Sequence, residues 1–276
     1  MTTAPPAARD IDGIVEGLLE RAGAVGRFPT PVDEIVVAAG LVESLDYVLT
    51  DEAIAQAPAQ LRDLLRSGRD KILGLVDRRE RVIHISPSID HPGRRSFVKM
   101  HEVAHHVLPW QRELVYADDD DSLSPSVRAQ FEREANYGAA ALLFQGSQFD
   151  ESITQLPVSL DSIDMVAGVF GASFRATARR YGERHARAVL IAALEGGEDG
   201  RWQRREVSVS PEWRRRFGTP AWPGVMTEDR FPVLEHVRQG SQAKARWRDQ
   251  NGQIAEVNIA GRAGAKWASY LLLTIP

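Results

Sequence analysis

The chain has 276 residues, of which 43% are hydrophobic and 26% charged, with 34 basic and 38 acidic side chains and no cysteine. At about 150 residues per domain, this predicts one large or two small folded domains and excludes a chain that is disordered as a whole. The lack of cysteine excludes disulfide bonds, thiolate nucleophiles and iron–sulfur clusters, so any metal must be held by His, Asp or Glu.

The hydrophobic runs are too short to predict a membrane span. The longest, Ala188–Leu194, is far below the roughly 20 residues that a spanning helix requires. The first ten residues lack the basic start and apolar stretch of a signal peptide. We therefore expect a cytoplasmic protein with no membrane partner.

The charges are divided unevenly along the chain. Residues 1–200 carry 21 basic and 31 acidic side chains, a net charge of −10, whereas residues 201–276 carry 13 and 7, a net charge of +6. The second region also holds five of the six tryptophans. Two regions of different character therefore share the chain.

The N-terminal third is predicted to be helical. Residues Ile11–Leu19 have apolar side chains at helical spacing. Thr30 is the expected N-cap of a second helix, with Asp33 completing a capping box and Gly40 ending the helix. Residues 52–68 predict a third amphipathic helix or a pair of short ones.

The central part of the chain combines a hairpin with two further helices. Apolar residues at 72–76 and 82–85, on either side of a polar turn, predict a β-hairpin. A helix is predicted from Phe97 to Leu108, and Ser124 is placed to cap a long helix that follows the acidic loop 117–122.

The last part of the chain changes from helices to strands. Residues 161–186 predict two short helices around a turn at 170–173, in the manner of a helix-turn-helix. Strands are predicted at 205–210, 243–248, 254–259 and 267–275.

The most informative segment is His101-Glu102-Val103-Ala104-His105, which matches the H-E-x-x-H pattern. On a helix, residues four apart project from the same side, so both imidazoles can reach one ion. Glu102 lies beside them and can take a proton from the water that attacks a carbonyl. The pattern predicts a zinc-dependent hydrolase.

A catalytic zinc keeps three protein ligands, so a third ligand is required. The positions at which another His-rich pattern would supply it are held by Leu108 and Gln111, so we expect a downstream carboxylate. The candidates are Glu113, Asp118 to Asp121, Glu132 and Glu134. We favour Glu132, because Ala135 and Ala139 on its helix allow close packing against the His-bearing helix.

Two segments of the chain resemble the ImmA/IrrE family of metallopeptidases. Residues 94–108 read R-R-S-F-V-K-M-H-E-V-A-H-H-V-L, and residues 132–143 read E-R-E-A-N-Y-G-A-A-A-L-L. The second segment is similar to the family's E-x-x-A-N, which is followed by small residues and a Leu pair. The resemblance covers about residues 10–185. One departure is Gln145-Gly146, where the family usually has Met-Pro.

The resemblance implies that His101, His105 and Glu132 bind the metal and that Glu102 is the general base. The implied cofactor is Zn²⁺, with Mn²⁺ as the alternative. Family members typically cleave a partner repressor of the helix-turn-helix type, which relieves repression of a DNA-damage, phage-defence or mobile-element response. The implied partner here is therefore such a repressor.

Several other residues are weaker candidates. Asn136 is a candidate for orienting a ligand by a hydrogen bond, and Tyr116, Tyr137 and His106 are candidates for stabilising an oxyanion. The C-terminal region combines basic and aromatic residues suited to single-stranded DNA, which would act as an activator. The residues to test there are Arg204, Arg205, Arg246, Arg248 and Trp247.

We therefore expect an α+β chain whose main part is a mostly helical, zincin-like metallopeptidase domain with a small β-sheet. The expected divisions are a flexible N-terminus at 1–10, the metallopeptidase domain at 11–150, a helix-turn-helix-like segment at 151–195 and a small strand-rich accessory or sensor domain at 196–276. The expected function is a regulatory zinc endopeptidase. The alternative is a DNA- or protein-binding regulator whose metal site is structural or vestigial.

Overall fold

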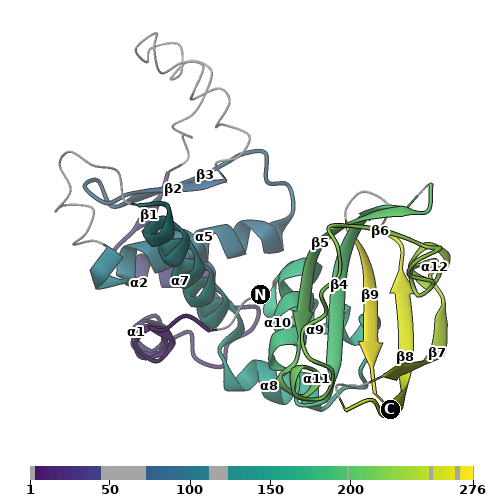
Figure 1. The fold of residues 1–276 in the computed structure, drawn as a ribbon. Helices are drawn as coiled ribbons and strands as arrows, with labels where there is room; N and C mark the ends of the chain where they lie inside the picture. The colour runs from purple at the N-terminus through teal and green to yellow at the C-terminus, as the bar shows by residue number, and fades with distance from the viewer. Residues whose placement is uncertain are drawn as a thin grey trace, which may run out of the picture. The chain divides into compact units, whose positions relative to one another are not determined.

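The computed structural model describes residues 4–44, 73–111, 124–197, 199–248, 251–264 and 268–275. It confirms an α+β chain, which divides into two compact units (Figure 1). The helical unit comprises Thr2–Gly146 and Val169–Ser173, and the sheet unit comprises Ser147–Gly168 and Phe174–Pro276. The expected third helix at 52–68 and the acidic loop at 117–122 lie outside the described residues.

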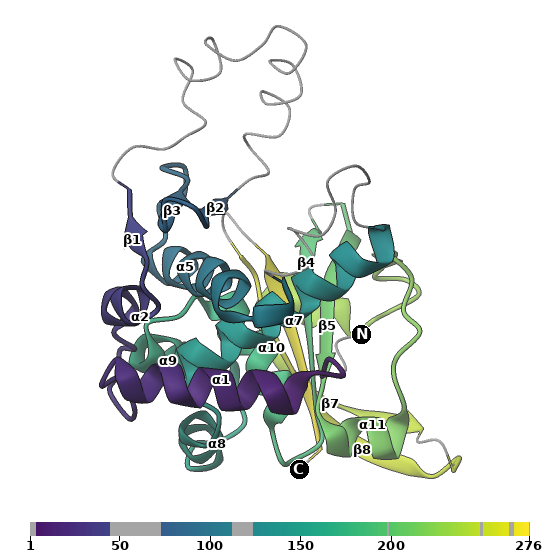
Figure 2. The same cartoon turned by 90° about the vertical axis from the view of Figure 1, so that its left-hand side faces the viewer.

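In its described residues, the helical unit packs four helices with a small sheet. Its elements are α1 (Ala8–Arg21), α2 (Val32–Ala38), β1 (Val42–Glu43), β2 (Gly74–Asp77), β3 (Val82–Ile85), α5 (Pro92–Val107) and α7 (Pro125–Phe144). The strand order is β1-β3-β2, with β1 parallel and β2 antiparallel to β3. Helix α5 contacts the sheet on one side and α7 on another (Figure 2). The hairpin expected at 72–85 is confirmed.

Helix α5 starts and stops as its sequence dictates. The Nδ1 atom of His91 accepts hydrogen bonds from the backbone N–H groups of Gly93, at 3.1 Å, and Arg94, at 3.3 Å, and Pro92 occupies the first helical position. The helix ends at Leu108, which adopts an extended conformation before Pro109.

Small residues bring α5 and α7 close together. Ala135 and Ala139 of α7 are fully buried, and a Cβ at Gly138 would lie 3.0 Å from the Cβ of Ala104 on α5. Because no bulky side chain separates the helices here, polar side chains elsewhere on α7 can reach those of α5.

Helix α7 is fixed at both ends by polar contacts. The Ser124 hydroxyl accepts a hydrogen bond from the Val127 N–H at 3.4 Å, as the sequence predicts for the cap. At the other end, Gln145 adopts a left-handed conformation with φ of 47°, and its side chain bonds the backbone of Gly26 at 2.7 Å and Ala24 at 3.0 Å. Gln145 therefore ties the end of α7 to the loop after α1.

The predicted N-cap of α2 is wrong. Pro31 occupies the N-cap position, which has no side-chain cap hydrogen bond. The Thr30 hydroxyl instead donates to the Leu143 carbonyl at 2.8 Å, more than one hundred residues away. The buried Thr30 satisfies the end of α7 rather than the start of its own helix. Gly40 follows the helix with φ of +74°, as expected for its end.

The sheet unit is built on six antiparallel strands. They are β4 (Val189–Gly196), β5 (Arg201–Val209), β6 (Val225–Thr227), β7 (Gln242–Arg248), β8 (Ile254–Arg262) and β9 (Ser269–Thr274), in the order β6-β5-β4-β9-β8-β7. Its described helices are α8 (Ser147–Thr154), α9 (Leu160–Phe170), α10 (Phe174–Arg184), α11 (Pro211–Phe217) and α12 (Leu234–Gln239). The last two residues of α9, after Gly168, belong to the helical unit. The expected division between residues 195 and 196 falls inside β4 and places most of that strand apart from β5 and β9, the strands with which it pairs.

The helix-turn-helix-like segment is present as α9, a turn and α10, but α10 packs on β4 and β5. Thr177 and Ala178 are buried, and Arg175 and Arg179 both form ion pairs with Glu206 of β5. The side of α10 that carries these arginines therefore faces the sheet, which leaves it poorly placed to enter a DNA groove.

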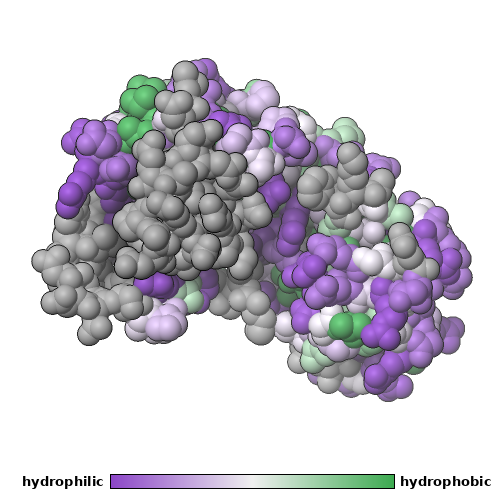
Figure 3. All heavy atoms as spheres, turned by 90° about the horizontal axis from the view of Figure 1, so that it is seen from above, coloured by the Kyte–Doolittle hydropathy of each residue, from purple (hydrophilic) through white to green (hydrophobic). Residues whose placement is uncertain are grey.

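One face of the molecule is mainly polar where its residues are described. Figure 3 shows one face on which hydrophilic residues predominate and hydrophobic residues form small separate patches. Among the described helices, none combines the length and apolar character needed to cross a bilayer.

Candidate metal centre

Two histidines of α5 direct their imidazoles to one point. His101 and His105 lie one turn apart, and their Nε2 atoms are 3.1 Å from each other. The two rings meet edge to face, with centroids 4.6 Å apart. Since Nε2 is the outer nitrogen of each ring, both histidines offer the same type of ligand atom on the same side of the helix.

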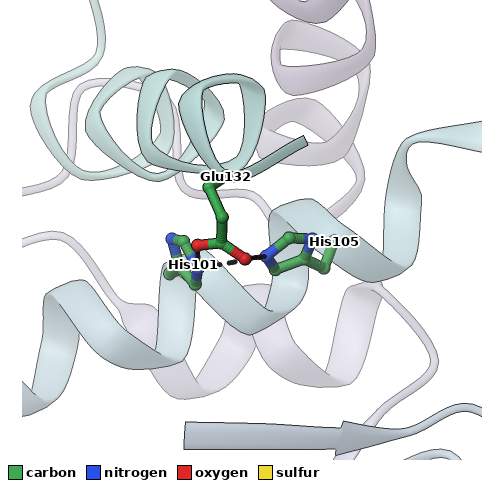
Figure 4. A group of neighbouring side chains, drawn as sticks. All are labelled: His101, His105 and Glu132. Atoms are coloured by element: carbon green, nitrogen blue, oxygen red, sulfur yellow. Dashed lines mark hydrogen bonds and ion pairs between the residues drawn. The ribbon is translucent and has the colours of Figure 1, made fainter. Parts of the chain in front are cut away.

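Glu132 of α7 completes the group. Its carboxylate lies between the two imidazoles, with Oε2 at 3.3 Å from His101 Nε2 and Oε1 at 3.4 Å from His105 Nε2 (Figure 4). These three residues form a cluster able to hold a metal ion among the residues that the structure describes. The structure thus brings together the three side chains that the sequence favours as ligands.

The distances suit a tetrahedral ion. With metal–ligand bonds of about 2.0–2.1 Å, neighbouring ligand atoms of a tetrahedron lie about 3.3 Å apart. The two imidazole nitrogens, 3.1 Å apart, are close to this separation, and each lies 3.3–3.4 Å from a different oxygen of the Glu132 carboxylate. Two His nitrogens and one carboxylate oxygen are also the donor set of many catalytic zinc sites.

The charges at the group favour a cation. Hydrogen bonds to His101 and His105 hold the pKa of Glu132 well below its usual range. Burial disfavours the charged form of His105, but hydrogen bonds with Glu132 and Gln111 outweigh it and raise the pKa of His105. The Glu132 side chain is 60% exposed, so the group is open to solvent on its side, as a catalytic site requires.

Glu102 is less exposed to solvent than the three candidate ligands. It is 8% exposed, and burial raises the pKa of its carboxyl above the usual value. Both histidines and Glu132 are close enough to influence it electrostatically. A carboxylate with a raised pKa beside a metal site has the properties of a general base.

A buried polar network lies behind His105. Its Nδ1 atom is 2.7 Å from Gln111 Oε1, and Gln111 Nε2 donates to Glu134 Oε2 at 3.1 Å. Trp110 and Gln130 also donate to the Glu134 carboxylate, at 2.8 and 2.9 Å. Glu134 is therefore buried and bound to other side chains, which distinguishes it from Glu132 as a candidate ligand.

The sequence did not identify Gln111 as part of the site. In the sequence, position 111 is notable only as the place where another metal-binding pattern has a histidine. The available signal was a glutamine six residues after His105, just past a helix that ends at a proline. That spacing alone does not show that the chain turns back toward His105.

The weaker candidates have other contacts. Asn136 donates to the backbone carbonyl of Glu132 at 2.7 Å and so bonds its own helix. The Tyr137 hydroxyl donates to both carboxylate oxygens of Asp12, at 3.0 and 3.1 Å. His106 is buried on α5. Glu113, Tyr116 and Asp118 to Asp121 lie outside the described residues.

The candidate nucleic-acid residues do not form one surface. Alternation along β7 places Trp247 on the face opposite Arg246 and Arg248, and Trp247 packs near Trp213 and Trp222. The remaining two candidates lie on β5, where Arg204 donates to the Pro223 carbonyl and Arg205 pairs with Glu195.

A helix bearing H-E-x-x-H, with a glutamate of a second helix beside its imidazoles, defines a site of the metallopeptidase type. The family model Peptidase_M78, described as an IrrE N-terminal-like domain, matches residues 60–181. This match confirms the resemblance to the ImmA/IrrE family over that part of the chain.

The fold is also found among solved structures. The chain is similar to a Mycobacterium tuberculosis transcriptional regulator, with a TM-score of 0.56 and 17% sequence identity over 97% of this chain and 76% of that chain. At this identity the likeness shows the fold alone. No curated protein matches the chain.

Proposed function

We propose that this chain is a regulatory zinc endopeptidase that cleaves a partner repressor of the helix-turn-helix type and thereby relieves repression of a stress response. The observation that carries the proposal is the convergence of His101, His105 and Glu132 beside the buried Glu102. The family match at residues 60–181 supports the peptidase class.

In this proposal, His101, His105 and Glu132 hold the ion, with Mn²⁺ as the alternative metal. Bound zinc would supply a Lewis acid that polarises the scissile carbonyl and acidifies water. Glu102 takes a proton from the attacking water as the new carbon–oxygen bond forms. It then gives that proton to the departing amine nitrogen as the carbon–nitrogen bond breaks, so no proton is gained or lost.

The environment of Glu102 suits both proton transfers. Burial raises the pKa of its carboxyl, which is the direction that favours a carboxyl group as general base and general acid near neutral pH. Its neighbour Gly74 has no side chain, so the backbone of β2 lies directly against the carboxylate. No described strand pairs with the outer edge of β2, since β3 is its partner on the other side. An extended substrate segment could bind there as an additional strand.

Regulation is supported less directly. The fold is similar to that of a protein named as a transcriptional regulator. The resemblance to the ImmA/IrrE family, which the family match at residues 60–181 supports, implies action on a repressor. The proposed partner is a small helix-turn-helix protein, and a gene for such a protein beside this one would identify the first candidate to test.

The alternative function is a DNA- or protein-binding regulator with a structural metal site. Structural zinc sites are closed by four protein ligands, whereas the described part of the chain supplies three to this group, one of them largely exposed. A structural site also has no need of a buried acid next to the ligands. Both observations favour catalysis.

The test is co-expression with the candidate repressor, comparing wild type, Glu102→Gln and His105→Ala. We expect the Gln variant to retain metal and to lose cleavage, and the Ala variant to lose both. Purification without added ions gives the metal content. Cleavage by Glu102→Gln at the wild-type rate would disprove the mechanism, and wild-type protein that takes up no metal would favour the alternative.

A further inference from the structure

A buried glutamine is the nearest side chain to the inner nitrogen of His105. Gln111 is 0% exposed, and its Oε1 atom lies 2.7 Å from His105 Nδ1. By contrast, His101 Nδ1 is buried and has no hydrogen-bond partner among the described residues. The two metal-binding candidates therefore differ in how they are held.

The orientation of the Gln111 amide is fixed by its surroundings. Its Nε2 side faces two acceptors, Glu134 Oε2 at 3.1 Å and the Phe131 carbonyl at 3.3 Å. Rotating the amide by half a turn would place oxygen against both acceptors. The NH₂ group must therefore point toward Glu134, which leaves Oε1 to face His105.

This orientation in turn determines the tautomer of His105. An amide oxygen only accepts hydrogen bonds, so Nδ1 must carry the proton that it donates. The neutral ring then has its lone pair on Nε2, the atom directed at His101 Nε2 and Glu132. A lone pair at this position is what metal binding requires.

The ends of the network are anchored independently. The Glu134 carboxylate also accepts hydrogen bonds from Trp110 and Gln130. The Arg78 guanidinium donates to the backbone carbonyls of His105 and Gln111, at 3.1 and 3.0 Å. Since Arg78 bonds both backbones, it fixes the separation between the histidine and the glutamine.

We propose that Gln111, held by Glu134, is a positioning residue that sets the tautomer and ring orientation of His105 for metal binding. The proposal rests on the proposed metal site and extends it to residues that do not touch the ion. Hydrogen-bond partners of this kind typically change metal affinity by about 10–100-fold when they are removed.

The first test measures zinc affinity of the full-length apoprotein by competition with a chelating dye. Gln111→Met keeps the size of the side chain but offers His105 only a weakly accepting sulfur and offers Glu134 no donor, and we expect about 10–100-fold weaker zinc binding. The matched control is Gln145→Met, which removes another buried glutamine of the same unit, away from the histidines. It should leave zinc affinity within about twofold of wild type, whatever it does to stability.

A pair of variants at Glu134 separates positioning from packing. Glu134→Leu removes the acceptor that orients the Gln111 amide and should weaken zinc binding as Gln111→Met does. Glu134→Gln keeps a carbonyl oxygen for Gln111 and Trp110 and should retain most of the wild-type affinity. Equal zinc affinity in Gln111→Met and wild type would overturn the proposal.

The second test needs no variant and decides the question even if Gln111→Met does not fold. In zinc-loaded wild-type protein labelled with ¹⁵N-histidine, we expect His105 to carry its proton on Nδ1 and to bind the metal through Nε2. Metal on Nδ1 would overturn the positioning role while leaving the metal site intact. Failure of the wild type to bind zinc would instead overturn the metal site, and the positioning role with it.

Discussion

Gly74 and Glu102 lie in direct contact: a Cβ at position 74 would be 2.7 Å from the Oε1 atom of Glu102 and 2.7 Å from Val98 Cγ1. Real Cβ atoms are essentially never found at such distances from their neighbours. The absence of a side chain at Gly74 therefore allows the β2 backbone and the proposed general base to occupy adjacent positions.

We predict that Gly74→Ala impairs cleavage without removing the metal. The methyl group must displace both the Glu102 carboxylate and Val98 Cγ1, or shift the strand. A shift of about 1 Å in a reacting group can lower the rate on the order of 100-fold. Zinc content should stay at the wild-type level, because Glu102 is not one of the ligands. The measurements are kcat/KM on the partner protein and metal content.

The matched control for this change is Gly13→Ala, since nothing lies within 4 Å of a Cβ at Gly13 in α1. It should cleave at the wild-type rate and be slightly more stable, as alanine favours a helix over glycine by roughly 0.5–1 kcal/mol. Undiminished cleavage by Gly74→Ala would show that the contact with Glu102 has no catalytic consequence.

Removal of the metal should lower the free energy of unfolding. Replacing the proposed ligand Glu132 should abolish most of this dependence on metal. A ligand that binds only the folded state at 100 times its Kd raises the free energy of unfolding by about 2.7 kcal/mol. We therefore expect zinc to raise the Tm of the wild type and a chelator to reverse this, with a much smaller response in Glu132→Gln. Thermal unfolding with and without zinc measures it.

Glu16→Gln is the matched control, since Glu16 is an exposed glutamate of α1 in the same unit. It should respond to zinc as the wild type does. An undiminished zinc response in Glu132→Gln would exclude Glu132 as a ligand and direct attention to another carboxylate.

The sequence alone predicts the relative placement of His101 and His105, but it does not determine which carboxylate completes the site. The spacing of four within one helix fixes the relative placement of the two histidines. Glu132 and Glu134, two residues apart, point about 200° away from each other around α7. Which of them faces α5 depends on how the two helices pack, which local sequence does not determine.

Residues Ala188–Leu194 illustrate a similar limit for the fold. The sequence shows a short hydrophobic run, and periodicity alone does not distinguish a buried strand from a buried helix. In the structure Val189 to Leu194 of this run lie in β4, between β5 and β9, and all are buried. The hairpin at 74–85 and the long helix capped by Ser124 were predictable because turn and cap residues mark their ends.

The hydroxyl of Thr30 provides a prediction about stability. Its bond to the Leu143 carbonyl is buried, so Thr30→Val leaves that carbonyl without its donor and should destabilise the helical unit by about 1–3 kcal/mol. Thr30→Ser keeps the hydroxyl and should cost less. Denaturant unfolding followed by circular dichroism measures both variants, and equal losses would show that the methyl group rather than the hydrogen bond matters.

The stability of the sheet unit should fall in mild acid because of His185. This side chain is buried at the end of α10, where its Nδ1 accepts a hydrogen bond from the Arg187 backbone at 3.0 Å. Burial, followed by the charge of Arg187, lowers the pKa of His185 below its ordinary value of 6.5. Between that lowered pKa and 6.5, the unfolded chain binds more protons than the folded one. The free energy of unfolding is therefore at its full value above about pH 6.5 and declines as the pH falls below it.

The variant His185→Asn retains an acceptor for the Arg187 N–H and cannot be protonated, so this decline should become shallower between pH 6.5 and 5. Arg187→Gln removes the neighbouring charge, which is the second cause of the lowered pKa of His185, so it should make the decline in the free energy of unfolding partly shallower. Denaturant unfolding followed by tryptophan fluorescence suits the measurement, because Trp202, Trp213, Trp222 and Trp247 all lie in the sheet unit. The same dependence on pH in wild type and His185→Asn would show that another group is responsible.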